Sequence, residues 1–83
     1  MRLVFAPKAE RDLCALDPQI RHRILRKLEW FVRADDPLVF AEPISEHKIA
    51  EWRFRIGDWR VLFDATDAHI IILRIGHRRE IYR

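Results

Sequence analysis

The stretch 52–63 constrains the fold more than any other part of the chain, because its pattern predicts a tight β-hairpin with two different faces. Trp52, Phe54 and Ile56 alternate with Arg53 and Arg55. Successive side chains of a strand point to opposite faces of a sheet, so the apolar residues share one face and the arginines share the other. The first strand of the hairpin therefore has an apolar back and a cationic front.

The turn of this hairpin is expected at Gly57-Asp58. Glycine adopts a positive φ at no steric cost and aspartate tolerates one, which suits a tight connection between two strands. A second strand follows, which begins near Arg60 and continues through the apolar residues 61–63. A third arginine thus joins the front of the sheet. Arginines gathered on one sheet face favour an anionic ligand lying against it.

The chain as a whole is short and moderately basic. Its 83 residues predict a single domain, residues 1–83, and a hydrophobic content of 49% is enough for one core. The net charge of +3 favours polyanions or an acidic protein as partners. Cys14 is the only cysteine, which excludes an intramolecular disulfide and fits a reducing, cytoplasmic setting. The apolar helix positions around Cys14 predict that it is a buried core residue. No apolar run reaches the roughly 18–20 residues of a membrane span, so no membrane partner is expected.

Two amphipathic helices are expected in the first half of the chain. A strand over residues 2–6 ends at Pro7, which suits the first turn of a helix. Pro18 suits the start of a longer helix that runs to about Ala34, and the short connection makes the two helices an antiparallel hairpin. Residues 35–50 are expected to form a loop in which Pro43 excludes a strand. Four apolar residues of this loop are expected to pack on the core: Leu38, Val39, Phe40 and Ile44.

The second half of the chain predicts consecutive antiparallel strands. After the hairpin, residues 69–75 form a near-continuous apolar run, which is typical of a central strand, and Gly76 is expected to break or bulge it. A last short strand is expected over 79–82. The fold class is therefore α+β: an antiparallel β-sheet meander with an N-terminal strand and an α-helical hairpin packed on one face. Three tryptophans are expected in the core or at its edge: Trp30, Trp52 and Trp59.

Seven residues of the two basic segments are suited to chemistry on an RNA phosphate. Cleavage of RNA without a metal needs a base for the 2′-hydroxyl, cations for the crowded phosphorane and an acid for the leaving oxygen. Arginine suits a phosphate, and histidine transfers protons near neutral pH. A tyrosine beside arginines can transfer a proton or stack on a base. The candidates are Arg53, Arg55, Arg60, His77, Arg78, Arg79 and Tyr82.

Each candidate also has a purely structural interpretation. Alternating arginines often form a solvated strand face, a histidine at a strand end is often only exposed, and a tyrosine near the chain end often packs on an edge strand. Arg60 is harder to explain in this way, since a charge on a central strand is costly unless it has a partner. The basic outer face of the second helix is either solvated or binds phosphates or an acidic partner. The histidines are scattered and no carboxylates are paired at ligand spacing, so no metal site and no cofactor are expected.

Four segments together resemble the RelE/ParE superfamily of toxin–antitoxin toxins, with RelE as the nearer branch. They are residues 5–13, the helix start Pro18-Gln-Ile-Arg, the block 53–63, and Ile-Gly-His-Arg-Arg-Glu-Ile-Tyr at 75–82. The resemblance implies a RelE-like fold and a metal-independent, ribosome-dependent mRNA endonuclease. Such an enzyme cleaves mRNA in the ribosomal A site by attack of the 2′-hydroxyl on the adjacent phosphate, and so inhibits translation.

The resemblance also implies roles for individual residues. Arg60 and Arg78 correspond to arginines that stabilise the phosphate, and Tyr82 corresponds to a tyrosine that stacks on and orients the substrate. Arg53 stands where some active members have a lysine, and His77 also stands where members of the family have a lysine. Because neither lysine is present, the resemblance leaves the general base unassigned. The predicted catalytic set is Arg60, His77, Arg78 and Tyr82, and the predicted substrate-binding set is Arg53, Arg55 and Arg79.

Two other functions stay open on the sequence alone. A ParE-like protein has the same fold but inhibits DNA gyrase without nuclease activity, and an inactive module would use its basic face only to bind an antitoxin. The presence of Arg60, Arg78 and Tyr82 together favours the nuclease. The partners implied by the resemblance are the ribosome with its mRNA and a cognate antitoxin, which folds an acidic segment onto the toxin in a hetero-oligomer.

Overall fold

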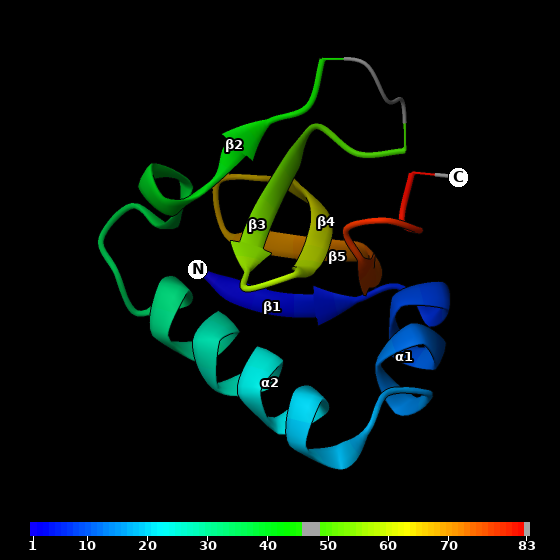
Figure 1. Cartoon of the computed structure of the whole chain (residues 1–83). Helices are drawn as coiled ribbons and strands as arrows, with labels where there is room; N and C mark the ends of the chain where they lie inside the picture. The colour runs from blue at the N-terminus through cyan, green and yellow to red at the C-terminus, as the bar shows by residue number, and fades with distance from the viewer. Residues whose placement is uncertain (46–48, 83) are drawn as a thin grey trace.

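The computed structural model describes residues 1–45 and 49–82, in which five strands form one sheet and two α-helices pack on one face (Figure 1). The order of the strands is β1-β5-β4-β3-β2. The α+β class predicted from the sequence is thereby confirmed. In chain order the elements are β1 (Arg2–Phe5), α1 (Pro7–Cys14), α2 (Pro18–Val32), the 3₁₀ helix η1 (Pro37–Phe40), β2 (Glu42–Pro43), β3 (Trp52–Ile56), β4 (Trp59–Ala65) and β5 (His69–His77).

The meander predicted for the second half of the chain is present. β3, β4 and β5 pair antiparallel in succession, and β1 pairs in parallel with the other side of β5. A parallel pair cannot be joined by a tight turn, and here the chain between β1 and the meander contains α1 and α2. β5 thus has a strand on each side, which is the central position that its apolar sequence predicted.

Both helices begin where their prolines predicted. Pro7 and Pro18 lie in the first turn, where the missing backbone N–H has no partner to lose. Asp17 caps α2, because its carboxylate accepts a hydrogen bond of 2.9 Å from the backbone nitrogen of Gln19. The chain passes from α1 to α2 through residues 15–17, and both helices contribute to the same core (Figure 1). No helix in the described part of the chain is long and apolar enough to span a membrane.

An aromatic stack fixes α2 on the sheet. The ring centroid of Phe54 on β3 lies 4.4 Å from that of Phe31 on α2 and 4.3 Å from that of Phe63 on β4. Phe54 and Phe63 are fully buried, as are Ile24 and Leu28 of α2. Burial of each such side chain contributes roughly 1.5–3 kcal/mol, so these few residues supply much of the stability of so small a chain.

The segment before β3 has more structure than the expected loop. η1 follows Asp36, whose carboxylate accepts a hydrogen bond of 3.1 Å from the backbone nitrogen of Leu38. β2 then pairs with β3 and places Glu42 opposite Arg53. The expectation that Pro43 excludes a strand was wrong, because β2 is an edge strand, where a proline without an N–H is tolerated. Residues 46–48, which belong to the same expected loop, lie outside the described residues.

The apolar residues of this segment do not all pack on the core. Leu38 packs against the core between helices and sheet, and Ile44 packs against a second cluster that contains Leu62. Val39 is 70% exposed, so its predicted burial was wrong, whereas Phe40 is partly exposed and stacks on the buried Phe31 at a centroid distance of 5.2 Å. η1 is a single turn, so only some of its side chains can point to the core. Pro37 is buried, and Val39 points to solvent.

Gly76 and the C-terminal residues differ from the expectations. β5 continues through Gly76, which lies opposite Arg60 on β4. A glycine suits this position because an added Cβ would lie 2.8 Å from Cδ1 of Ile81, whose side chain would then have to move. Residues 78–82 form turns instead of the expected strand, and the backbone nitrogen of Ile81 donates to the carbonyl of His77 over 2.9 Å. The chain therefore folds back over Gly76 onto the sheet.

Two residues predicted for the core are exposed. Cys14 is exposed at the end of α1, and Trp30 on α2 is 54% exposed. Helix positions rotate by about 100° per residue, so the neighbour of an inward-facing residue such as Phe31 points away from the core. Trp52 and Trp59 do pack at the edge of the core, as predicted.

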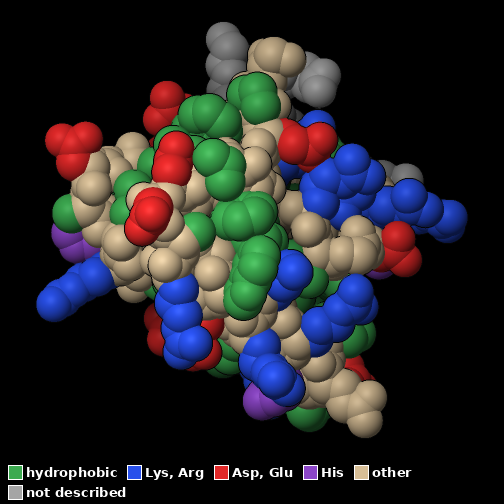
Figure 2. Space-filling model, turned by 90° about the vertical axis from the view of Figure 1, so that its left-hand side faces the viewer, with side chains coloured by type: hydrophobic (Ala, Val, Ile, Leu, Met, Phe, Trp, Pro, Cys, Tyr) green, Lys and Arg blue, Asp and Glu red, His purple; other side chains and the backbone are tan. Residues whose placement is uncertain are grey.

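The exposed Trp30 belongs to an apolar surface shared by α2 and η1. Its ring centroid lies 4.9 Å from that of Phe40, and the ammonium of Lys27 lies 4.6 Å from it. Figure 2 views the side of the molecule where η1 and β2 lie and shows hydrophobic side chains gathered in a run down the middle of this face. Lys and Arg side chains gather to the right of the run and below it. Runs of this kind are candidate contact surfaces for other proteins.

Candidate functional site

The hairpin between β3 and β4 forms the base of the candidate site. Gly57 has a φ of 60°, as the turn predicted, and the register places Arg55 directly opposite Arg60. Like charges directly opposite each other on a sheet are destabilising. The fold nevertheless holds these two guanidinium groups on one face, next to Arg53 two positions away.

Arg60 is the buried charge of the site. Its residue is only 7% exposed, and its Nη1 donates hydrogen bonds to the carbonyls of Gly57 at 2.8 Å and Trp59 at 3.0 Å. Among the described residues it has no carboxylate partner. Burial lowers the pKa of Arg60, and the neighbouring Arg55 lowers this pKa further. Because arginine stays protonated even so, Arg60 carries a positive charge for which the described part of the chain supplies no carboxylate.

Arg53 links β2, β3 and the C-terminal segment. Its Nε donates to the carboxylate of Glu42 at 3.2 Å, and its Nη1 donates to the hydroxyl oxygen of Tyr82 at 2.9 Å. The hydrogen bond to Tyr82 raises the pKa of Arg53, burial opposes this, and Glu42 adds to the increase. The second oxygen of Glu42 lies 3.6 Å from Nη1 of Arg55. One carboxylate therefore holds two of the arginines.

The turn after β5 supplies the remaining residues. Its first residue, Arg78, donates its backbone N–H to the carbonyl of Asp58 at 2.8 Å, which ties the turn to the hairpin. The side chain of Arg78 also pairs with the Asp58 carboxylate at 3.5 Å. Ile81 then packs over Gly76, which brings Tyr82 to the front of the sheet beside Arg53.

These side chains line one open hollow of about 400 Å³. Five arginines and a tyrosine converge on it from β3, β4 and the C-terminal turn. All but one of the seven candidates predicted from the sequence are thus brought together. The lining residues are Arg53, Arg55, Arg60, Arg78, Arg79 and Tyr82.

His77 is the candidate that does not line this hollow. Successive strand residues face opposite ways, and β5 runs through Gly76 without the expected break, so His77 faces the helix side together with its register partner Trp59. The two rings meet edge to face at a centroid distance of 5.4 Å. His77 Nδ1 accepts a hydrogen bond of 3.2 Å from the backbone nitrogen of Arg79.

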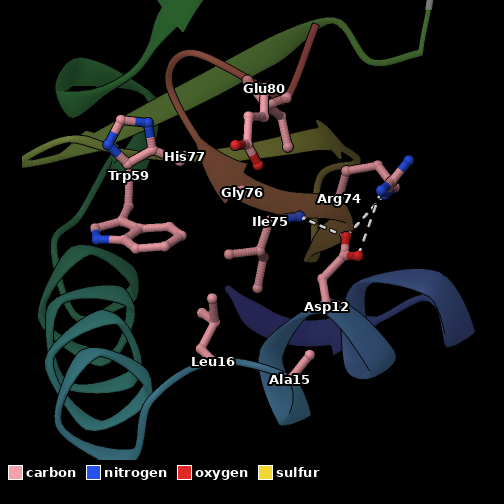
Figure 3. A pocket seen from close by; sticks show the side chains of 10 residues that line it. Asp12, Ala15, Leu16, Trp59, Arg74, Ile75, Gly76, His77 and Glu80 are labelled. Atoms are coloured by element: carbon pink, nitrogen blue, oxygen red, sulfur yellow. Dashed lines mark hydrogen bonds and ion pairs between the residues drawn. The ribbon is translucent and has the colours of Figure 1, made fainter. Parts of the chain in front are cut away.

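His77 lines a separate hollow of about 360 Å³ between α1 and β5 (Figure 3). On the other side of it, Asp12 accepts hydrogen bonds from Nε of Arg74 at 2.7 Å and from the backbone nitrogen of Ile75 at 3.0 Å. The Asp12 carboxylate is thus used to anchor α1 on β5. This second hollow contains none of the arginines of the first.

Sequence reasoning missed one acidic residue of the site. Glu42 lay in an expected loop, and no local pattern indicates that it pairs with Arg53 across two strands. The sequence contains one weak indication that Glu42 is extended. A proline biases the residue before it toward extended backbone, and Pro43 follows Glu42. No group of three or more histidine, cysteine, aspartate or glutamate side chains in the described residues could hold a metal ion.

The whole chain is similar to known toxins. Residues 3–82 match the family described as the ParE toxin of the type II toxin-antitoxin system parDE. Toxin RelG of Mycobacterium tuberculosis (strain ATCC 25618 / H37Rv) is 34% identical over 84 residues, covering 95% of this chain and 92% of the relative. The chain belongs to the RelE/ParE superfamily of type II toxins.

Solved structures of toxin–antitoxin complexes have the same fold as this RelE/ParE toxin. The RelBE2 complex of Mycobacterium tuberculosis matches with a TM-score of 0.75 and 28% identity, covering 93% of this chain and 96% of the matched chain. The RelB-RelE complex of Methanococcus jannaschii matches with a TM-score of 0.71 and 25% identity, covering 95% and 94%. The RelE-like fold predicted from the four segments is therefore confirmed.

Proposed function

We propose that this toxin is a metal-independent, ribosome-dependent mRNA endonuclease. The observation that carries the proposal is the buried Arg60, which lacks a carboxylate partner among the described residues and lies in a hollow lined by four further arginines. An uncompensated buried charge is costly unless a ligand pairs with it. A phosphate is the anion that arginine forks fit best.

The arrangement suits in-line cleavage of RNA. The 2′-oxygen attacks the adjacent phosphorus, a bond from 2′-oxygen to phosphorus forms, and the bond to the 5′-oxygen breaks. The products are a 2′,3′-cyclic phosphate and a 5′-hydroxyl. The proton that the 2′-hydroxyl loses is balanced by the proton that the 5′-oxygen gains. Arg60 and Arg78 would stabilise the extra negative charge of the phosphorane. A donor placed for such a charge typically contributes about 2.7–4 kcal/mol to the barrier.

Tyr82 contributes an aromatic ring and a proton to the same hollow. Nη1 of Arg53 donates a hydrogen bond of 2.9 Å to the oxygen of its hydroxyl. The ring can stack on a base next to the cleaved bond, which typically contributes about 1–3 kcal/mol of binding energy. Of the residues that line the hollow, the others are arginines, which do not transfer protons near neutral pH. Tyr82 is therefore the proposed proton-transfer residue of the hollow.

The dependence on the ribosome follows from the RelE-like resemblance and fits the size of the site. A hollow of about 400 Å³ contacts too little RNA to select a message alone. A ribosome that holds the mRNA in its A site would supply the missing positioning, which is worth several orders of magnitude in rate when reacting groups are aligned.

The direct test is cleavage of mRNA on translating ribosomes by the purified toxin. We expect breaks in the message at the A site with the ribosomes present, and little cleavage of the same RNA without them. Intact transcripts together with loss of DNA supercoiling by gyrase would instead identify a gyrase inhibitor.

An antitoxin is the proposed protein partner. The two solved structures described above are complexes of a toxin with its antitoxin. The cationic hollow and the apolar surface around Trp30 together suit a partner segment that carries both acidic and apolar side chains. Co-expression of the adjacent open reading frame should restore growth and yield a complex that survives size-exclusion chromatography. Persistent growth arrest would exclude that gene product as the antitoxin.

A further inference from the structure

The carboxylate of Glu42 is built into the cationic site although it does not line the hollow. It lies on the edge strand β2, where one oxygen accepts from Nε of Arg53 at 3.2 Å and the other lies 3.6 Å from Nη1 of Arg55. Arg53 in turn donates from Nη1 to the hydroxyl oxygen of Tyr82 at 2.9 Å. A continuous chain of charged and polar contacts thus runs from β2 to the C-terminal tyrosine.

We propose that Glu42 is a positioning residue that holds Arg53, and through it the phenol of Tyr82, in place for catalysis. The inference rests on the proposed function, because it assigns the role of Tyr82 to RNA cleavage. The hydrogen bonds themselves exist without RNA, so the positioning can be tested separately from cleavage.

The geometry explains why two contacts are needed on Arg53. An arginine side chain has several rotatable bonds, and one hydrogen bond at its tip leaves it free to pivot. Glu42 fixes the Nε side of the guanidinium while Tyr82 occupies Nη1, so the planar fork is held at two points. Charge-assisted hydrogen bonds are stronger than neutral ones, which suits them to this task.

The backbone of β2 also directs Glu42 toward Arg53. Pro43 follows Glu42 and biases it toward extended backbone, which is the conformation found in β2. The register of β2 and β3 then places Glu42 directly opposite Arg53. Opposite charges at such a cross-strand position stabilise the pair and set its side-chain directions.

Direct contact of Glu42 with the substrate is a poor alternative. A carboxylate repels a phosphate, and the residues that line the hollow are five arginines and Tyr82, without Glu42. If Glu42 were only a counter-ion, its removal would strengthen RNA binding and leave the tyrosine unchanged. If it is a positioning residue, its removal moves the tyrosine as well.

The test compares Glu42→Gln with Glu51→Gln. Both substitutions remove one negative charge next to β3, but the Glu51 side chain makes no ion pair among those found in the described residues. Tyr82 is the only tyrosine of the chain, so tyrosine labelled with ¹³C at Cζ gives a single NMR resonance that reports on its hydrogen bonding. The same proteins, freed of antitoxin, are assayed for kcat and KM on translating ribosomes.

We expect Glu42→Gln to shift the Cζ resonance and to lower kcat about tenfold, while KM stays the same or falls because the hollow becomes more positive. Glu51→Gln should leave the resonance and kcat unchanged, and Glu42→Asp should recover part of the loss. An unmoved tyrosine resonance in Glu42→Gln overturns the positioning role, whether or not RNA is cleaved. A moved resonance with an unchanged kcat overturns its link to catalysis. If the parent toxin cleaves no RNA, the proposed function fails, and the NMR comparison still decides whether Glu42 positions Tyr82.

Discussion

At the scale of single residues, the central feature is a buried guanidinium that pairs with no carboxylate within residues 1–45 and 49–82. Arg60 is held by carbonyl oxygens of the hairpin turn and is surrounded by other arginines. A fold selected only for stability would place an apolar residue there, because a buried charge costs more than carbonyl contacts return. Local arrangements that work against stability are expected where a ligand completes them.

Arg60→Ala should strongly reduce cleavage while the protein stays folded. We expect kcat on ribosomes to fall by about 10²–10³, which corresponds to one lost donor to the transition state. The free energy of unfolding should change by no more than about 1 kcal/mol, since the loss of two hydrogen bonds is offset by relief of the buried charge. Cleavage assays and urea denaturation measure the two quantities. If the Arg60→Ala toxin is folded and fully active, Arg60 has no role in cleavage.

At the scale of elements, the part that the sequence predicted best was the hairpin. Its alternation, its glycine and its paired strands all lie within a few residues, so short-range pattern was sufficient. β2 was not predictable, because its two residues are a strand only through pairing with β3. The same limit applies to the C-terminal turn: residues 79–82 have a strand-like composition, but Ile81 folds back because Gly76 leaves room for it.

The alternation of side chains along β5 could have predicted the position of His77. The sequence grouped it with the arginines because it lies in the same basic segment and because histidine transfers protons near neutral pH. Without a break, alternation alone assigns His77 to the face opposite its neighbour. The membership of Arg53, Arg55 and Arg60 was predictable because each follows from strand parity in the hairpin. The placement of the C-terminal turn over Gly76 and the pairing of Glu42 with Arg53 depend on contacts between segments that are distant in the sequence.

Gly76→Val tests whether the C-terminal turn is positioned by this glycine. A branched side chain at 76 would collide with Ile81, whose Cδ1 lies 2.8 Å from the site of an added Cβ. We expect the turn that carries Arg78 and Tyr82 to detach, with loss of cleavage and a melting temperature lower by several degrees. Gly76→Ala should be milder, because the tip of Ile81 can rotate away.

Gly57→Ala is the matched comparison for that variant. This substitution is unfavourable because residue 57 has a φ of 60°, and it does not touch the C-terminal turn. Gly57→Ala should therefore destabilise the hairpin by about 1–2 kcal/mol. Circular dichroism and cleavage assays distinguish the two variants. If Gly76→Val were as active and as stable as the parent, the turn would not depend on Gly76.

At the scale of the whole molecule, the site depends on a main core between helices and sheet and on a second small cluster that includes Leu62 and Ile81. Stability of about 0.05–0.15 kcal/mol per residue gives roughly 4–12 kcal/mol for a chain of 83 residues. Phe54 stacks between Phe31 and Phe63 at the centre of this core. Phe54→Ala should therefore cost about 3–5 kcal/mol, a large part of the total. Denaturant unfolding measures this loss, and Val39→Ala, at a position 70% exposed, should have almost no effect.

The charge of the whole molecule predicts how RNA binding depends on salt. Each phosphate that the toxin neutralises contributes about −0.7 to the slope of log affinity against log salt for a single strand. Arg79 lines the hollow, whereas Arg2 lies on β1 at the other edge of the sheet. We expect Arg79→Ala to make the slope less steep by about 0.7, while Arg2→Ala leaves it unchanged, although both variants lower the net charge equally. Fluorescence anisotropy of a short labelled RNA over a salt series gives both slopes. Equal slopes in the two variants would mean that RNA responds to the net charge of the toxin and not to the hollow.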